Sequence, residues 1–168
     1  MRRLLVTFIA TLGALLLAVG VAGAASQTVA GDKYGGKLGD IKKIVASNGK
    51  NAVSTKVFGL GKPCGGAQFL SVKVQNKSGK TLYAGEAGCF SGPDGPVWDA
   101  YMIDKGDAIV KCGKFSVNRI KSNGAYKVIM PRGCMSNAPN RIRVEVDGHN
   151  FASATGGHAG PTKLLARG

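Results

Sequence analysis

The chain has 168 residues, which suits one domain, and it contains 44% hydrophobic residues, 26 glycines and only 19% charged residues. Lys and Arg outnumber Asp and Glu by 23 to 9, which gives a formal net charge of +14. This composition excludes a collagen, a coiled coil, a long helical bundle and a wholly disordered chain. What remains is a strongly cationic, glycine-rich globular domain.

Residues 1–24 are predicted to be a signal peptide. Arg2 and Arg3 precede an apolar run from Leu4 to Val21, and the small-x-small sequence that ends at Ala24 is a cleavage signal. A membrane anchor is the alternative, since about 18 apolar residues can just span a bilayer. The small-residue exit favours cleavage. Cleavage removes Arg2 and Arg3, so the net charge falls to +12, and the protein is expected outside the cell or at its envelope.

The four cysteines all follow the predicted cleavage site. An even number of cysteines in an oxidising compartment predicts two disulfides, and three connectivities are open. We favour Cys64–Cys89 and Cys112–Cys134, because each pair consists of neighbours along the chain that bracket a plausible hairpin. A zinc site is disfavoured, because the gaps exceed twenty residues and zinc cysteines are usually closely spaced. We therefore expect no metal and no cofactor.

Residues 25–35 are small, polar and glycine-rich, and they are predicted to be a flexible leader. Short runs of alternating apolar and polar residues, separated by Gly, Asn and Pro turns, then predict nine strands. These strands cover residues 41–46, 53–57, 70–75, 81–84, 97–103, 108–112, 115–120, 125–130 and 142–146. The spacing indicates an all-β fold, a single antiparallel β-sandwich of jelly-roll or immunoglobulin-like type over 36–148. Residues 149–168 are predicted to be a flexible Gly/Ala-rich tail.

Two stretches resemble a known group of proteins. They are GDIKKIVASNGKNAVSTKVFGL, which opens the domain, and CGKFSVNRIKSNGAYKVIMPRGCMSNAPNRIRVEV, which closes it. Together they resemble small secreted actinobacterial proteins of unassigned function and, in outline, the sandwich plan of family 9 carbohydrate-binding modules and DOMON-type domains. The resemblance implies a sandwich in which Cys112 and Cys134 bracket a hairpin. The sugar-clamping aromatic residues of those modules have no match here, because Trp98 is the only tryptophan.

No catalytic residues are predicted from motifs. His149 and His158 both lie in the predicted tail, where they are expected to be solvated, so a histidine-dependent nucleophile has no base in the predicted core. Asp104 and Asp107 flank the predicted turn at Lys105-Gly106, which indicates turn formation more than a calcium site. A carboxylate-dependent glycan hydrolase remains an alternative, because the sequence cannot show whether two acids face each other across a cleft.

The excess of basic residues carries the main hypothesis. Lys73, Lys127, Arg141 and Arg143 fall on the polar sides of predicted strands, and a shared sheet would make them one positive face. Such a face attracts polyanions. We therefore expect a non-catalytic binding domain for an anionic cell-wall polymer, glycan or lipid surface, and no nucleic acid. A secreted protease inhibitor that presents the loop at Cys64 or Cys134 is a further alternative; a membrane-active cationic protein is disfavoured because no amphipathic helix is predicted. The oligomeric state stays open.

Overall fold

The structure is a computed structural model that describes residues 24–32, 40–64, 68–150 and 153–168. The predicted signal peptide, apart from Ala24, lies outside the described residues, as does the part of the predicted leader from residue 33. Within the described residues there is no α-helix, and no helix is long or apolar enough to span a bilayer. The fold is therefore all-β, as predicted.

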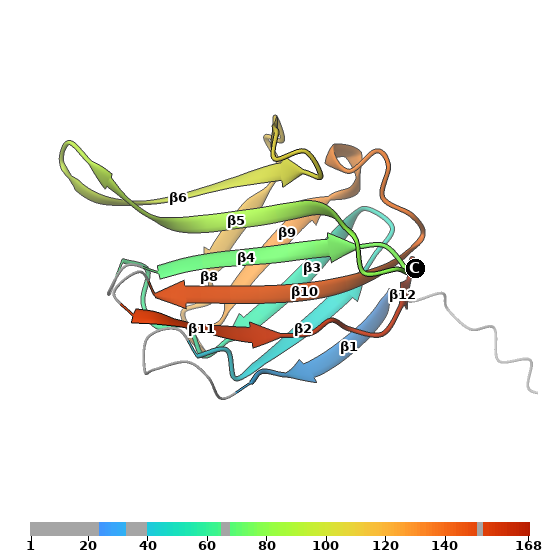
Figure 1. Cartoon of the computed structure of the whole chain (residues 1–168), viewed down its shortest axis with the longest axis horizontal. Helices are drawn as coiled ribbons and strands as arrows, with labels where there is room; N and C mark the ends of the chain where they lie inside the picture. Colours follow the sequence, from blue (N-terminus) through green and yellow to red (C-terminus); the bar gives the residue numbers. More distant parts are fainter. Residues whose placement is uncertain (1–23, 33–39, 65–67, 151–152) are drawn as a thin grey trace, which may run out of the picture.

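The part of the chain that the structure describes contains twelve strands, which form two antiparallel sheets (Figure 1). The five-stranded sheet has the order β1 (Ala25–Ala30), β2 (Lys43–Asn48), β3 (Ala52–Phe58), β9 (Tyr126–Pro131) and β8 (Ser116–Arg119). The seven-stranded sheet has the order β11 (Ser153–Ala159), β10 (Arg141–Asn150), β4 (Gln68–Gln75), β5 (Thr81–Gly92), β6 (Gly95–Asp104) and β7 (Ile109–Val110), and β12 (Leu165–Ala166) pairs with β10. A 3₁₀ turn, η1 (Arg132–Cys134), follows β9.

The inner faces of the two sheets share one hydrophobic core. Alternate residues of each strand point inward, so Val53 and Val57 on β3 are buried, as are Val144 and Val146 on β10. Across the core, the ring centroids of Trp98 and Tyr126 lie 5.5 Å apart. The alternation of apolar and polar residues that predicted these strands therefore corresponds to the burial of every second side chain.

The chain crosses between the two sheets three times, and the disulfides lie at these crossings. Cys64 lies between β3 and β4, Cys112 between β7 and β8, and Cys134 between β9 and β10. The disulfides join Cys64 to Cys89 and Cys112 to Cys134, the pairing favoured from the sequence. They are consistent with a protein that resides in an oxidising compartment.

The predicted flexible ends are wrong for the residues that the structure describes. Residues 25–30 of the predicted leader form β1, which pairs with β2 along its whole length. In the predicted tail 149–168, residues 153–159 form β11 against β10, and Leu165 on β12 is buried in the core. The glycines there serve close packing. A Cβ on Gly156 would meet the Gly148 carbonyl oxygen at 2.7 Å, which is too close for any side chain.

Candidate functional site

The four basic residues predicted as a binding face do not share one surface. Lys73 on β4 and Arg141 and Arg143 on β10 point outward from the seven-stranded sheet. Lys127 lies on β9, which pairs with β3 in the other sheet, and points outward on the opposite side of the molecule. The sequence predicted each residue's polar orientation, but which strands share a sheet depends on pairings between distant segments.

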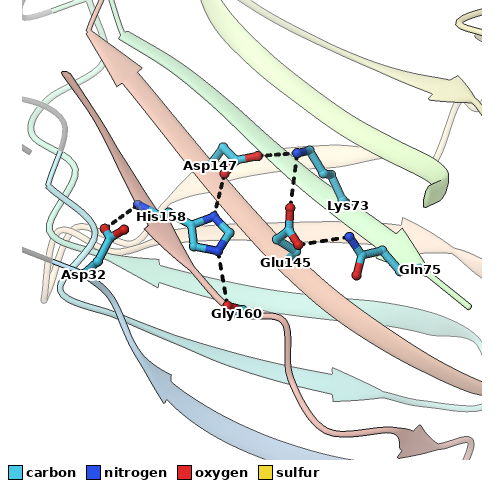
Figure 2. A network of polar contacts seen from close by, with 7 residues as sticks. All are labelled: Asp32, Lys73, Gln75, Glu145, Asp147, His158 and Gly160. Carbon is cyan, nitrogen blue, oxygen red and sulfur yellow. Dashed lines mark hydrogen bonds and ion pairs between the residues drawn. The ribbon is translucent and has the colours of Figure 1, made fainter. Parts of the chain in front are cut away.

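Lys73 is also not a free cation. Its Nζ lies 2.5 Å from Asp147 Oδ2 and 3.2 Å from Glu145 Oε1, and both acids come from the adjacent strand β10 (Figure 2). Gln75 Nε2 donates a hydrogen bond to the other oxygen of Glu145, at 3.0 Å. The ammonium group of Lys73 is therefore neutralised by two carboxylates and is unavailable to an external anion.

His158 extends this network, contrary to its prediction as a solvated tail residue. β11 places it directly opposite Asp147, and its Nδ1 lies 2.7 Å from Asp147 Oδ1 (Figure 2). Its Nε2 lies 3.1 Å from the carbonyl oxygen of Gly160, and its backbone N–H donates to Asp32 Oδ1. Both ring nitrogens face acceptors, which is the arrangement of a doubly protonated imidazolium. The sequence signal was weak: one histidine in a Gly/Ala-rich segment.

The network shifts three pKa values in the same sense, toward the charged forms. For His158, partial burial lowers the pKa, but the hydrogen bond and charge of Asp147 outweigh it and raise the pKa above its ordinary value. For Asp147, burial raises the pKa, but the hydrogen bonds from Lys73 and His158 outweigh it and lower the pKa. For Lys73, burial lowers the pKa, and the two carboxylates more than reverse that effect. Each partner thus keeps the others ionised.

The stability of the protein should therefore fall as pH rises through the raised pKa of His158. The imidazolium contributes fully below the ordinary histidine pKa of about 6.5, and its contribution is lost above the folded-state pKa. At the acid end, the contribution of Asp147 is lost only as pH falls through its lowered pKa. Urea unfolding of wild type and His158→Gln, compared between about pH 5 and about pH 9, measures this loss.

The wild type should be the more stable of the two proteins at the lower pH, and its advantage should shrink as His158 loses its proton. A His149→Gln variant serves as the control, since His149 is exposed on β10 beside Phe69 and makes none of the ion pairs described for the network. Parallel pH curves for wild type and His158→Gln would show that the imidazolium adds nothing to folding.

The network could hold a metal ion only after a rearrangement. Glu145, Asp147 and His158 offer ligand atoms within 4.8 Å of one another. The ammonium of Lys73, however, already bridges the two carboxylates. The lowered pKa of Asp147 is also the reverse of what a glycosidase general acid needs, since that group must stay protonated. The chemistry of this cluster is that of a compensated ion-pair network.

The outer face of the five-stranded sheet has a different character. Lys43 on β2, Lys56 on β3 and Lys127 on β9 all point outward from it, and we name these three residues the lysine face. Lys56 and Lys127 stand directly opposite each other on paired strands. Lys43 stands opposite Phe58, with its Nζ 4.9 Å from the ring centroid. The pairing of β3 with β9, which the sequence does not show, creates this group.

Acidic residues are missing from the lysine face. None of the nine acids of the chain lies on a strand of the five-stranded sheet. Five of them lie on β5, β6 and β10 of the other sheet: Glu86, Asp99, Asp104, Glu145 and Asp147. No ion pair of the described residues involves a lysine of the lysine face. The five-stranded sheet thus carries lysines and no acids on its strands, whereas the strands of the other sheet carry both.

No protein-family model, curated protein or solved structure matches the chain. The proposals below therefore depend on the chemistry of the described residues alone.

Proposed function

We propose that this protein is a non-catalytic, secreted binding domain of β-sandwich type whose lysine face holds an anionic polymer or surface outside the cell. The observation that carries the proposal is the direct pairing of Lys56 with Lys127, with Lys43 on the same face and no carboxylate on any strand of that sheet. The proposal includes cleavage of residues 1–24 as a signal peptide. It also includes the β-sandwich plan of family 9 carbohydrate-binding modules and DOMON-type domains, which the sequence resembles in outline.

The lysine pair has a cost that an anion would remove. Like charges directly opposite each other on neighbouring strands destabilise a sheet. An anionic group placed over Lys56 and Lys127 converts this repulsion into two attractive contacts. The surroundings suit such a ligand, because the outward residue Ser54, two positions from Lys56 on β3, has a hydroxyl that can donate a hydrogen bond. A flat array of cations and hydroxyls favours an extended anion over a small one.

The triple variant Lys43→Gln, Lys56→Gln, Lys127→Gln should lose most of the binding. A basic residue near an anionic surface contributes about 1 kcal/mol, so three lysines correspond to an affinity change of roughly a hundredfold. Retention on the protein's own cell envelopes and on polyphosphate-coated beads, across a salt series, measures the effect. Wild type should elute at moderate salt, because exposed charges are screened within about 10 Å at 0.1 M ionic strength.

A charge-matched control separates this face from net charge. Lys80→Gln, Lys105→Gln and Lys111→Gln remove the same three charges from exposed turns and loops attached to the seven-stranded sheet. This control should elute close to wild type. If both triple variants lose retention equally, binding depends on net charge and not on the lysine face. If salt does not weaken the retention of wild type, the partner is not held by charge.

A further inference from the structure

A pocket of about 360 Å³ lies at one end of the seven-stranded sheet and shares no residue with the lysine face. It is lined by Asn76 and Lys77 from the β4–β5 turn, by Pro139 and Arg141 at the start of β10, and by Leu164 just before β12. The volume falls at the small end of the range typical of small-molecule sites, about 300–1,000 Å³. It suits a small molecule better than a polymer.

The lining combines apolar surface with uncompensated positive charge. Leu164 is 39% exposed and belongs to the few large hydrophobic side chains of the described residues that face solvent. Lys77 and Arg141 are exposed and form no ion pair among the described residues. No carboxylate lines the pocket. An apolar wall with two free cations is complementary to a molecule with an apolar part and one negative group.

The walls of the pocket are fixed before any ligand binds. The carbonyl oxygen of Pro139 accepts a hydrogen bond from Arg132 Nη1 at 3.1 Å. Next to Leu164, Thr162 makes two hydrogen bonds with the backbone of Val144, through its own N–H at 2.9 Å and its Oγ1 at 3.0 Å.

The third wall is held by its own turn, in which Asn76 Oδ1 accepts hydrogen bonds from the backbone N–H groups of Ser78 and Lys80. A preformed pocket loses less conformational entropy on binding than a flexible one, which favours affinity even for a small ligand.

We propose that this pocket binds an alkyl carboxylate, with the chain packed on Leu164 and Pro139 and the carboxylate between Lys77 and Arg141. The proposal is independent of the lysine face, because the two sites share no residue and lie on different sheets. An eight-carbon carboxylate has ten non-hydrogen atoms, and at the binding efficiency per atom typical of drug-sized ligands its Kd would be roughly 6 mM.

Titration with sodium octanoate below its micelle concentration, followed in ¹H–¹⁵N spectra of the purified protein, tests the site. The amides of Lys77, Arg141 and Leu164 should shift together and saturate. Acetate, which lacks the chain, and octyltrimethylammonium, which has the chain but the opposite charge, should each bind at least about fivefold more weakly, because each satisfies only half of the lining.

Two variants separate the apolar and the charged contributions. Leu164→Asn and the double variant Lys77→Gln, Arg141→Gln should each weaken octanoate about fivefold, with spectra that otherwise match wild type. The double variant Lys56→Gln, Lys127→Gln on the lysine face should leave octanoate binding unchanged, so the failure of one site is distinguishable from failure of the other.

The proposal is overturned by octanoate and octyltrimethylammonium binding equally, by shifts centred on other residues, or by unchanged affinity in both pocket variants. An absence of shifts at a tenfold excess over the expected Kd would overturn it as well.

Discussion

Replacing Asn48 by alanine is expected to lower the free energy of unfolding by about 3 kcal/mol, because a buried side chain that makes three hydrogen bonds is lost. Asn48 ends β2 and is fully buried. Its Nδ2 donates hydrogen bonds to the carbonyl oxygens of Leu165 at 2.8 Å and Asn140 at 3.1 Å. Its Oδ1 accepts a hydrogen bond from the Arg132 guanidinium. One side chain therefore ties β2 to β12 and to the segment before β10.

The Arg132 contact makes this loss larger than that of an ordinary asparagine. Arg132 is 8% exposed and forms no ion pair among the described residues. Burial, and after it the charge of Arg167, lowers the pKa of Arg132. Its positive charge is stabilised by neutral oxygens alone, from Asn48 and from the carbonyls of Ala138 and Pro139. Loss of the amide oxygen leaves a desolvated cation with fewer acceptors, which is costly.

Urea unfolding of Asn48→Ala measures the loss, and Asn48→Asp shows its cause. Aspartate supplies Arg132 with a counter-ion but turns both amide donors into acceptors that face carbonyl oxygens, so we expect it to be destabilising too. Asn118→Ala, at an exposed position on β8, is the control and should stay within about 0.5 kcal/mol of wild type. If Asn48→Ala unfolds at the same urea concentration as Asn118→Ala, the hydrogen bonds of the Asn48 side chain contribute no net stability.

The strands that were predictable from the sequence are those with a strong apolar alternation. Val53, Val57, Val144 and Val146 mark β3 and β10 unmistakably, because one face of each strand is buried in the core. Turn residues were equally informative. Asn76 and Asp104 each accept two or more backbone hydrogen bonds inside the turns predicted for them.

The elements that the sequence missed consist of small residues whose role is set by distant neighbours. β5 was predicted to end at Ala84 but continues to Gly92. Gly85 weakens the local strand signal, yet a Cβ there would lie 2.8 Å from the ring of Phe115 on the opposite side of the core. The same holds for Gly156 in β11. Glycine is required at these strand positions because another part of the chain packs closely against the backbone. From composition alone, the same glycines indicate a flexible segment.

The candidate sites show the same division between local and distant information. That Lys127 faces water followed from its own strand, and so did the outward orientation of Lys73. That Lys127 faces Lys56 while Lys73 faces Glu145 depends on the pairings β3–β9 and β4–β10. These pairings join segments more than sixty residues apart, and nothing in either segment specifies its partner. The charge excess was thus visible in the sequence, and its division between two faces was not.

Removing the Cys112–Cys134 disulfide should lower the free energy of unfolding by about 3 kcal/mol in the chain-entropy treatment of a loop of this length. The two cysteines are 22 residues apart and belong to two different crossings between the sheets. Both pack against the hydrophobic core. The bond therefore joins the connection from β7 to β8 with the connection from β9 to β10, and so fastens both ends of the β8–β9 hairpin to the seven-stranded sheet. The double variant Cys112→Ala, Cys134→Ala, unfolded in urea beside wild type, measures its contribution.

The second disulfide provides the matched comparison. Cys64–Cys89 closes a loop of nearly the same length, with a separation of 25 residues, but it fastens only one crossing to a strand. On loop entropy alone the two double variants should be destabilised equally, since the cost grows only with the logarithm of loop length. Because Cys112 and Cys134 also pack on the core, the Cys112→Ala, Cys134→Ala variant should have a lower free energy of unfolding than the Cys64→Ala, Cys89→Ala variant. Reduced wild type, which lacks both disulfides, should be less stable than either variant. Equal midpoints for both variants would assign the whole effect to loop closure, and midpoints equal to that of oxidised wild type would show that neither bond stabilises the fold.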